Sequence, residues 1–127
     1  MPRYWTVDEA RAALPEVIAL LEELRRAVQQ QARAGAAAPV AAPGTRVSVN
    51  GHGAARPDDP VRQAARVLER INGMGVQVKD IALGLIDFPY LRSGEEVLLC
   101  YRLGEPDIGF WHDLHSGFAG RRPLSEL

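Results

Sequence analysis

The sequence predicts an α+β fold in which two amphipathic helices pack on one face of a three- to four-stranded antiparallel meander. Apolar residues recur at helical spacing in the first half of the 127-residue chain, and after Gly75 they change to alternating or continuous runs. The connections between those runs are short and carry turn residues. They therefore favour antiparallel neighbours over the long crossovers that parallel strands require.

The first helix is predicted to start at Val7. Thr6 and Glu9 have the capping-box pattern, in which each side chain accepts a hydrogen bond from the backbone amide of the other residue. Pro15 lacks an amide donor and presses on the preceding turn, so we expect a kink there. The helix should end near Gly35. Its apolar face is spaced by three and four residues: Val17, Leu20, Leu21, Leu24 and Val28.

Residues 35–57 are rich in Ala, Pro, Gly, Ser and Asn, which is typical of a flexible linker. We expect this linker to join the two helices of a single domain spanning residues 1–127. His52 lies inside it between two glycines. Ordering so flexible a segment costs more entropy than one imidazole ligand offsets, so His52 is interpreted as a solvated loop histidine.

The second helix should have Asp59 as its N-cap and Pro60 as its first residue, and should run to about Asn72. Glycines then stop it, and Met74 should pack back onto the core. Four strand candidates follow: residues 76–78, 85–88, 96–102 and 108–112.

Charge and hydropathy restrict the partners of the chain. Its 15 basic and 16 acidic side chains nearly cancel, so no overall field would draw it to nucleic acid or anionic lipid. No segment has the roughly 20 apolar residues of a membrane span, and no signal-peptide pattern opens the chain. One cysteine cannot form an internal disulfide, which agrees with a reducing compartment. We expect a cytoplasmic protein, with nucleic acid and membranes disfavoured as partners.

Most residue types that chemistry uses are gathered in the last quarter of the chain. It holds the only cysteine, two of the three histidines, and Trp111. Strand alternation points Trp111 and His112 to opposite faces. No catalytic residue or cofactor is identified from these residues. The binding candidates are Glu105, Trp111, His112, Arg121 and Arg122.

The weak candidate ligands for a metal are Cys100, His112 and His115, with a carboxylate from Glu105, Asp107 or Asp113. Zinc or iron accepts such nitrogen, sulfur and oxygen ligands. A strand, however, sends the two imidazoles of a His-x-x-His pair to opposite sides, and strand register is not fixed by the sequence. A single cysteine in an apolar run is typical of a small core residue, so no metal is favoured. A cysteine nucleophile is disfavoured as well, because apolar burial raises a thiol pKa.

Two loops near these candidates have simpler interpretations. The Leu103–Asp107 connection is a Gly/Pro turn, whose Glu105 and Asp107 should pair with Arg102, Arg121 or Arg122. The glycines at 117 and 120, with the two following arginines, could receive an anion between backbone amides. Phe118 is expected to anchor the tail against the sheet.

Three stretches carry a resemblance: Tyr4-Trp-Thr-Val-Asp-Glu-Ala10, Gly84-Leu-Ile-Asp-Phe-Pro89, and residues 99–112 together with 117–121. On these residues the chain resembles an uncharacterised prokaryotic domain-of-unknown-function family, the DUF2203-like family. The resemblance implies a compact single domain. It also singles out residues 99–112 and 117–121 as a specific family motif, but it implies no particular reaction. The family pattern often has an acidic residue at the place of His115, so no two-histidine site is implied.

The leading hypothesis for function is a non-catalytic interaction module. In that hypothesis the outer sheet face exposes an aromatic residue, such as Trp111 or Tyr101, to a protein partner or a second copy in a homo-oligomer. The alternative is a small-molecule or metal-binding protein, with enzyme activity left open, that uses a His/Glu/Arg site in the C-terminal segment.

Overall fold

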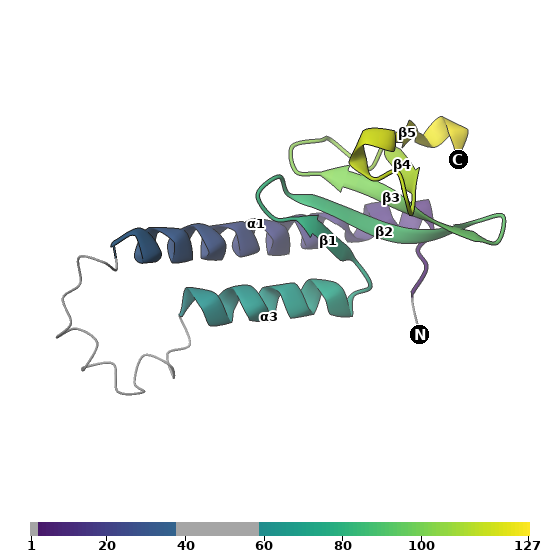
Figure 1. The fold of residues 1–127 in the computed structure, drawn as a ribbon. Coiled ribbons are helices and arrows are strands. Elements are labelled where there is room, and N and C mark those ends of the chain that lie inside the picture. Colours follow the sequence, from purple (N-terminus) through teal and green to yellow (C-terminus); the bar gives the residue numbers. More distant parts are fainter. Residues whose placement is uncertain (1–2, 38–58) are drawn as a thin grey trace.

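The structure is a computed structural model that describes residues 3–37 and 59–127 (Figure 1). It confirms the α+β class. The helices are α1 (Val7–Ala37) and α3 (Pro60–Gly73). The strands are β1 (Gln77–Asp80), β2 (Leu85–Arg92), β3 (Glu95–Arg102), β4 (Phe110–Asp113) and β5 (Arg122–Pro123). Two short 3₁₀ helices complete the C-terminal segment: η3 (Phe118–Gly120) and η4 (Leu124–Glu126).

Helix α1 starts at the predicted capping box. The Thr6 amide donates to Glu9 Oε1 at 2.9 Å, and the Glu9 amide donates to Thr6 Oγ1 at 3.0 Å. Pro15 lies inside the helix without ending it. Its ring is exposed, so water can reach the Arg11 carbonyl that loses a helical donor.

Helix α1 ends at Ala37, close to its predicted end near Gly35, so the first residues of the linker predicted at about 35–57 are helical. The rest of it, with His52, lies outside the described residues. Helix α3 begins as predicted, since the Asp59 carboxylate accepts from the Val61 amide at 2.9 Å. Met74 is partly buried against the core, also as predicted.

The sheet has five antiparallel strands in the order β1-β2-β3-β4-β5, so the predicted number of three to four is wrong. Strand β5 has only two residues, one of them proline, and therefore shows no apolar alternation. Strand β2 also continues through Pro89, beyond its predicted end. Strand β1 pairs only with Leu85–Asp87, so Pro89 lies where β2 is an edge and needs no amide donor on that side.

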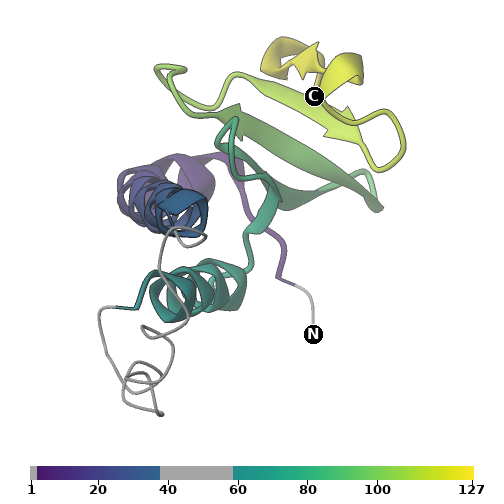
Figure 2. The same cartoon turned by 60° about the vertical axis from the view of Figure 1, so that its left-hand side comes forward.

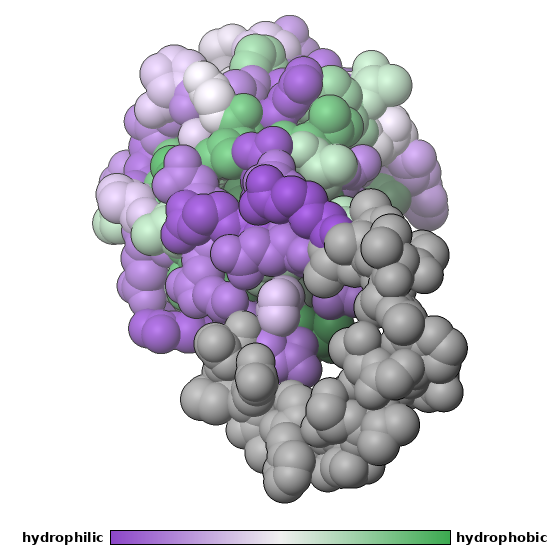
Figure 3. Space-filling view, turned by 90° about the vertical axis from the view of Figure 1, so that its left-hand side faces the viewer, coloured by the Kyte–Doolittle hydropathy of each residue, from purple (hydrophilic) through white to green (hydrophobic). Residues whose placement is uncertain are grey.

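The core joins both helices to one face of the sheet. Figures 1 and 2 show α1 and α3 side by side, with the C-terminal segments at the opposite edge of the sheet. The Trp5 ring meets Phe88 edge-on, with 5.2 Å between ring centres. Figure 3 views the molecule from the left-hand side of Figure 1, and hydrophilic side chains dominate the middle of the described surface there, with hydrophobic ones gathered towards the top. The sheet contributes these core residues: Ile86, Phe88, Val97, Leu99, Tyr101 and Trp111.

Tyr101 and Trp111 are therefore not the exposed aromatic residues of an outer face. Tyr101 is 2% exposed and Trp111 is 3% exposed, and both belong to the core cluster that contains helix residues. The Tyr101 hydroxyl donates to the Glu105 carbonyl at 2.9 Å. The sequence could not reveal this, because alternation separates the two faces of a strand without saying which one the helices cover.

Candidate functional site

Three polar side chains meet on the sheet face opposite the core. They are Asp87 on β2, Cys100 on β3 and His112 on β4, which are 1%, 0% and 4% exposed respectively. Their oxygen, sulfur and nitrogen atoms all lie within 4.8 Å of one another. Among the residues that the structure describes, these are the ones that group as candidate metal ligands. We call them the Asp87–Cys100–His112 cluster.

The strand register produces this cluster. Strands β2 and β3 pair continuously, which sets Asp87 directly opposite Cys100. Cys100 in turn pairs with Phe110 of β4, and His112 follows Phe110 on the same face. His112 is therefore a diagonal neighbour of Cys100, at the distance where side chains on one face still interact. Its imidazole also extends over β3 to Asp87, which lies two strands away.

The hydrogen bonds of His112 leave one proton to be accounted for. Nδ1 lies 2.8 Å from the Asp113 carbonyl, which can only accept, so Nδ1 carries a proton. In a neutral imidazole Nε2 is then an acceptor, yet it faces Asp87 Oδ1 at 3.1 Å. An ionised carboxylate is also an acceptor. A proton or a cation must therefore lie in the cluster.

Burial governs the acid–base properties of the cluster. Desolvation raises the pKa of Asp87, although His112 and Cys100 partly oppose this. Burial and the charge of Asp87 raise the pKa of the Cys100 thiol to about 12, with partial opposition from Arg121. The thiol is thus protonated at neutral pH when no cation is bound, which argues against a free cysteine nucleophile.

A cavity of about 170 Å³ adjoins the cluster. Asp87, Leu98 and His112 line it from the sheet, and Lys79 borders it from β1. The segment after β4 contributes the remaining wall with Leu114, His115, Gly117 and Phe118. Burial shields the three cluster side chains from bulk water, while Asp87 and His112 also line this partly open cavity.

A model of the family of uncharacterized conserved proteins called DUF2203 matches residues 3–124. The chain belongs to the DUF2203 family. No curated protein and no solved structure matches it. All three cluster residues of this DUF2203 protein lie within the matched range. Within the described part of the chain, no helix is long and apolar enough to cross a membrane.

Two of the predicted binding residues of this DUF2203 protein are bound to each other. Arg121 donates to both carboxylate oxygens of Glu105, at 2.9 and 2.7 Å, and Glu105 Oε1 also accepts from the Arg102 amide. Burial raises the pKa of Glu105, but these donors outweigh burial and lower it overall. The pairing expected for Asp107 is wrong, because it contacts Arg11 of α1 at 3.5 Å.

The other predicted residues are separated. His115 is exposed and is not part of the Asp87–Cys100–His112 cluster, although it lines the neighbouring cavity. Trp111 and Arg122 instead line a larger cavity. As predicted, Trp111 and His112 point to opposite faces, because Trp111 pairs with Leu99 of the core and His112 with Leu98.

Sequence reasoning missed Asp87. The carboxylates considered as metal ligands were Glu105, Asp107 and Asp113, none of which joins the cluster. The available signal was a carboxylate between Ile86 and Phe88, inside an apolar strand pattern. A charged residue in that position is unusual in a buried strand and indicates a buried partner.

Proposed function

We propose that this protein binds a divalent transition metal, with zinc the best match, through Asp87, Cys100 and the Nε2 atom of His112. The main support for this proposal is that three buried side chains from three adjacent strands converge, with their potential ligand atoms within 4.8 Å of one another. Thiolate, imidazole and carboxylate are the ligand types that zinc takes in proteins.

The hydrogen bond from His112 Nδ1 to the Asp113 carbonyl supports this proposal. It fixes the ring so that the Nε2 lone pair points into the cluster, which is the usual arrangement of a metal-bound histidine. A divalent cation would accept lone pairs from both His112 Nε2 and Asp87 Oδ1, the two acceptor atoms that face each other. It would also displace the proton of the buried Cys100 thiol, which would bind as a thiolate.

Three protein ligands leave one position of a tetrahedral zinc ion for water or a small ligand. The cavity beside Asp87 and His112 is large enough for a few water-sized groups, and Lys79 borders it. This arrangement is typical of reactive zinc sites, whereas structural sites are closed by four protein ligands. The reaction that such a site would serve stays open.

Metal content tests the proposal directly. Protein purified without chelator and then dialysed against zinc should retain one zinc ion per chain in elemental analysis. C100S, D87N and H112Q should each lose most of it, because each removes one ligand from the cluster. E69Q is the matched control for D87N, since Glu69 is exposed on α3 and lies outside both the cluster and the cavity beside it. Retention by all three cluster variants, or no zinc in the wild type, would refute the proposal.

The interaction module predicted from the sequence remains a prediction, as do the protein partner, the homo-oligomer and the cytoplasmic location. The aromatic residues on which the module rested are buried. The apolar side chains exposed beside the cluster are Phe110, Leu114 and Phe118. Sedimentation over a wide concentration range would test self-association without reference to the metal.

A further inference from the structure

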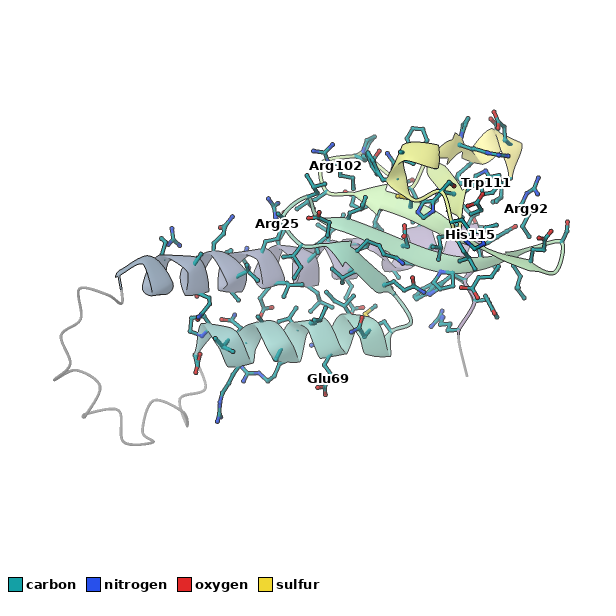
Figure 4. All side chains as sticks on the ribbon, viewed as in Figure 1. Arg25, Glu69, Arg92, Arg102, Trp111 and His115 are labelled. Carbon is teal, nitrogen blue, oxygen red and sulfur yellow. The ribbon has the colours of Figure 1, made fainter. Side chains whose placement is uncertain are left out.

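We propose that a second cavity, formed around Trp111, binds the oxyanion group of a small molecule, a carboxylate or a phosphate. This cavity has a volume of about 390 Å³. Arg92 from β2 and Arg122 from β5 line it together with Trp111 from β4. Figure 4 shows Arg92, Trp111 and His115 gathered in the same part of the sheet.

The indole of Trp111 provides a buried donor with no acceptor. The residue is 3% exposed, and its Nε1 atom has no hydrogen-bond partner in the described structure. The other tryptophan is different, because Trp5 Nε1 donates to the Gly75 carbonyl at 3.1 Å. Buried donors in folded proteins nearly always have partners. Trp111 is one of the residues that line the cavity, and a ligand bound there would supply the missing acceptor.

Two arginines present further donors to the same space. The Arg92 and Arg122 guanidinium groups lie 4.9 and 5.4 Å from the centre of the Trp111 ring. Among the described residues neither one forms an ion pair with a carboxylate, and Arg92 makes only a 3.4 Å contact with the Glu126 carbonyl. The planar fork of a guanidinium matches the geometry of a carboxylate or phosphate, and stacking on an aromatic ring holds it in place.

None of the three acidic residues that line the cavity forms an ion pair with Arg92 or Arg122. Asp113 Oδ1 accepts from the amides of His115 and Ser116 and from the Ser116 hydroxyl. Glu96 accepts from the Tyr4 hydroxyl at 3.1 Å. Glu95 is exposed at the end of the β2–β3 hairpin. Asp113 and Glu96 therefore bind donors other than the two arginines, and within the described part of the chain the Trp111 indole and both guanidinium groups have no carboxylate partner.

This cavity is independent of the proposed metal site. Trp111 and His112 point to opposite faces of β4, so a ligand beside Trp111 does not contact the Asp87–Cys100–His112 cluster. His115 borders both cavities, but it belongs to neither donor set. Failure of one proposal would consequently leave the other unchanged.

The two indole N–H signals in a proton–nitrogen NMR spectrum test the inference. Sodium phosphate and sodium acetate are titrated separately, against sodium chloride at equal ionic strength, with W111F used to assign the Trp111 signal. The Trp111 signal should shift and saturate with at least one oxyanion, while the Trp5 signal stays in place as the internal reference. Saturation by phosphate alone or by acetate alone also supports the inference, and identifies the class of ligand.

Arginine variants complete the test. R92Q and R122Q should each weaken the binding of that oxyanion by about tenfold or more, because a charge-assisted pair is lost. R102Q is the matched control, since Arg102 is exposed and lies away from Trp111 in Figure 4. The inference is overturned by an unmoved Trp111 signal, by an equal shift with chloride, or by unchanged affinity in both R92Q and R122Q.

Discussion

His112 Nε2 faces Asp87 Oδ1 at 3.1 Å, while Nδ1 of the same ring is already satisfied by the Asp113 carbonyl at 2.8 Å. Nε2 of a neutral imidazole protonated on Nδ1 is an acceptor, and so is Oδ1 of an ionised carboxylate. The two facing atoms of His112 and Asp87 would then both be acceptors. Cys100 adds a third buried group within the same 4.8 Å. A shared proton satisfies this arrangement in the metal-free protein, and a divalent metal satisfies it with all three residues as ligands.

The D87N substitution should stabilise the metal-free protein. Asp87 is buried, so its charge is costly, whereas an amide of the same shape can donate to Nε2 of His112. We expect a gain of about 1–2 kcal/mol in the free energy of unfolding, measured by urea denaturation in the presence of a chelator near neutral pH. A loss of stability in D87N would show that the ionised carboxylate is already well paired without metal.

The pH dependence of stability should differ between the wild type and D87N. Burial raises the folded-state pKa of Asp87 above its unfolded value of about 3.9. The folded state therefore holds a proton that the unfolded state has released, and this contribution to stability is lost as pH rises from the unfolded pKa through the folded one. Unfolding curves of metal-free protein across this window should show the loss in the wild type only. Parallel pH profiles for the two proteins would contradict the raised pKa.

The E105Q substitution should destabilise the protein by about 2 kcal/mol, because it leaves Arg121 without its two-pronged partner. The pair is 13% and 21% exposed, so water replaces the lost contact poorly. Because the folded pKa of Glu105 is lowered, its contribution is complete above the unfolded pKa of about 4.3 and is lost as pH falls through the folded pKa. E95Q is the control, and equal effects of the two substitutions in urea denaturation would contradict this role.

Gly84 should be intolerant of alanine. It has φ of +68°, and an added Cβ would lie 2.5 Å from the Leu103 Cβ. Gly94 has a comparable φ of +84° but open space around it, so G94A is the matched control. G94A should cost about 1 kcal/mol from backbone strain, and G84A about 3 kcal/mol, because the clash pushes apart the turns that flank β2 and β3. Equal thermal stability of G84A and G94A would show that the predicted contact between the added Cβ and Leu103 does not destabilise the protein.

Local patterns predicted much of the fold. The Thr6 and Glu9 capping box and the Asp59 N-cap depend on neighbours a few residues apart, and both were predicted correctly. The two-residue strand β5 was missed because its pairing with β4 is a tertiary contact that leaves no pattern in so short a segment. The continuation of β2 through Pro89 was missed because proline signals a turn unless the edge of the sheet is known.

The candidate site was only partly predictable. Alternation separated Trp111 from His112, but only the register could bring Asp87 beside Cys100 and His112, and a slip of one residue would have turned Asp87 into the core. The contacts of Trp111 with Arg92 and Arg122 also depend on how the strands pair, because the two arginines lie on other strands. Neither feature is encoded in local spacing.

The spectrum of the cobalt-substituted protein tests the metal proposal most directly, because it reports bonding to the Cys100 sulfur itself. Adding one equivalent of Co²⁺ to the metal-free protein should produce a near-ultraviolet thiolate-to-cobalt charge-transfer band, together with visible bands of a four-coordinate ion. One equivalent of zinc should abolish these bands, and C100S should lack the charge-transfer band while E69Q retains it. A wild-type spectrum identical to that of aqueous Co²⁺ would contradict the proposed site.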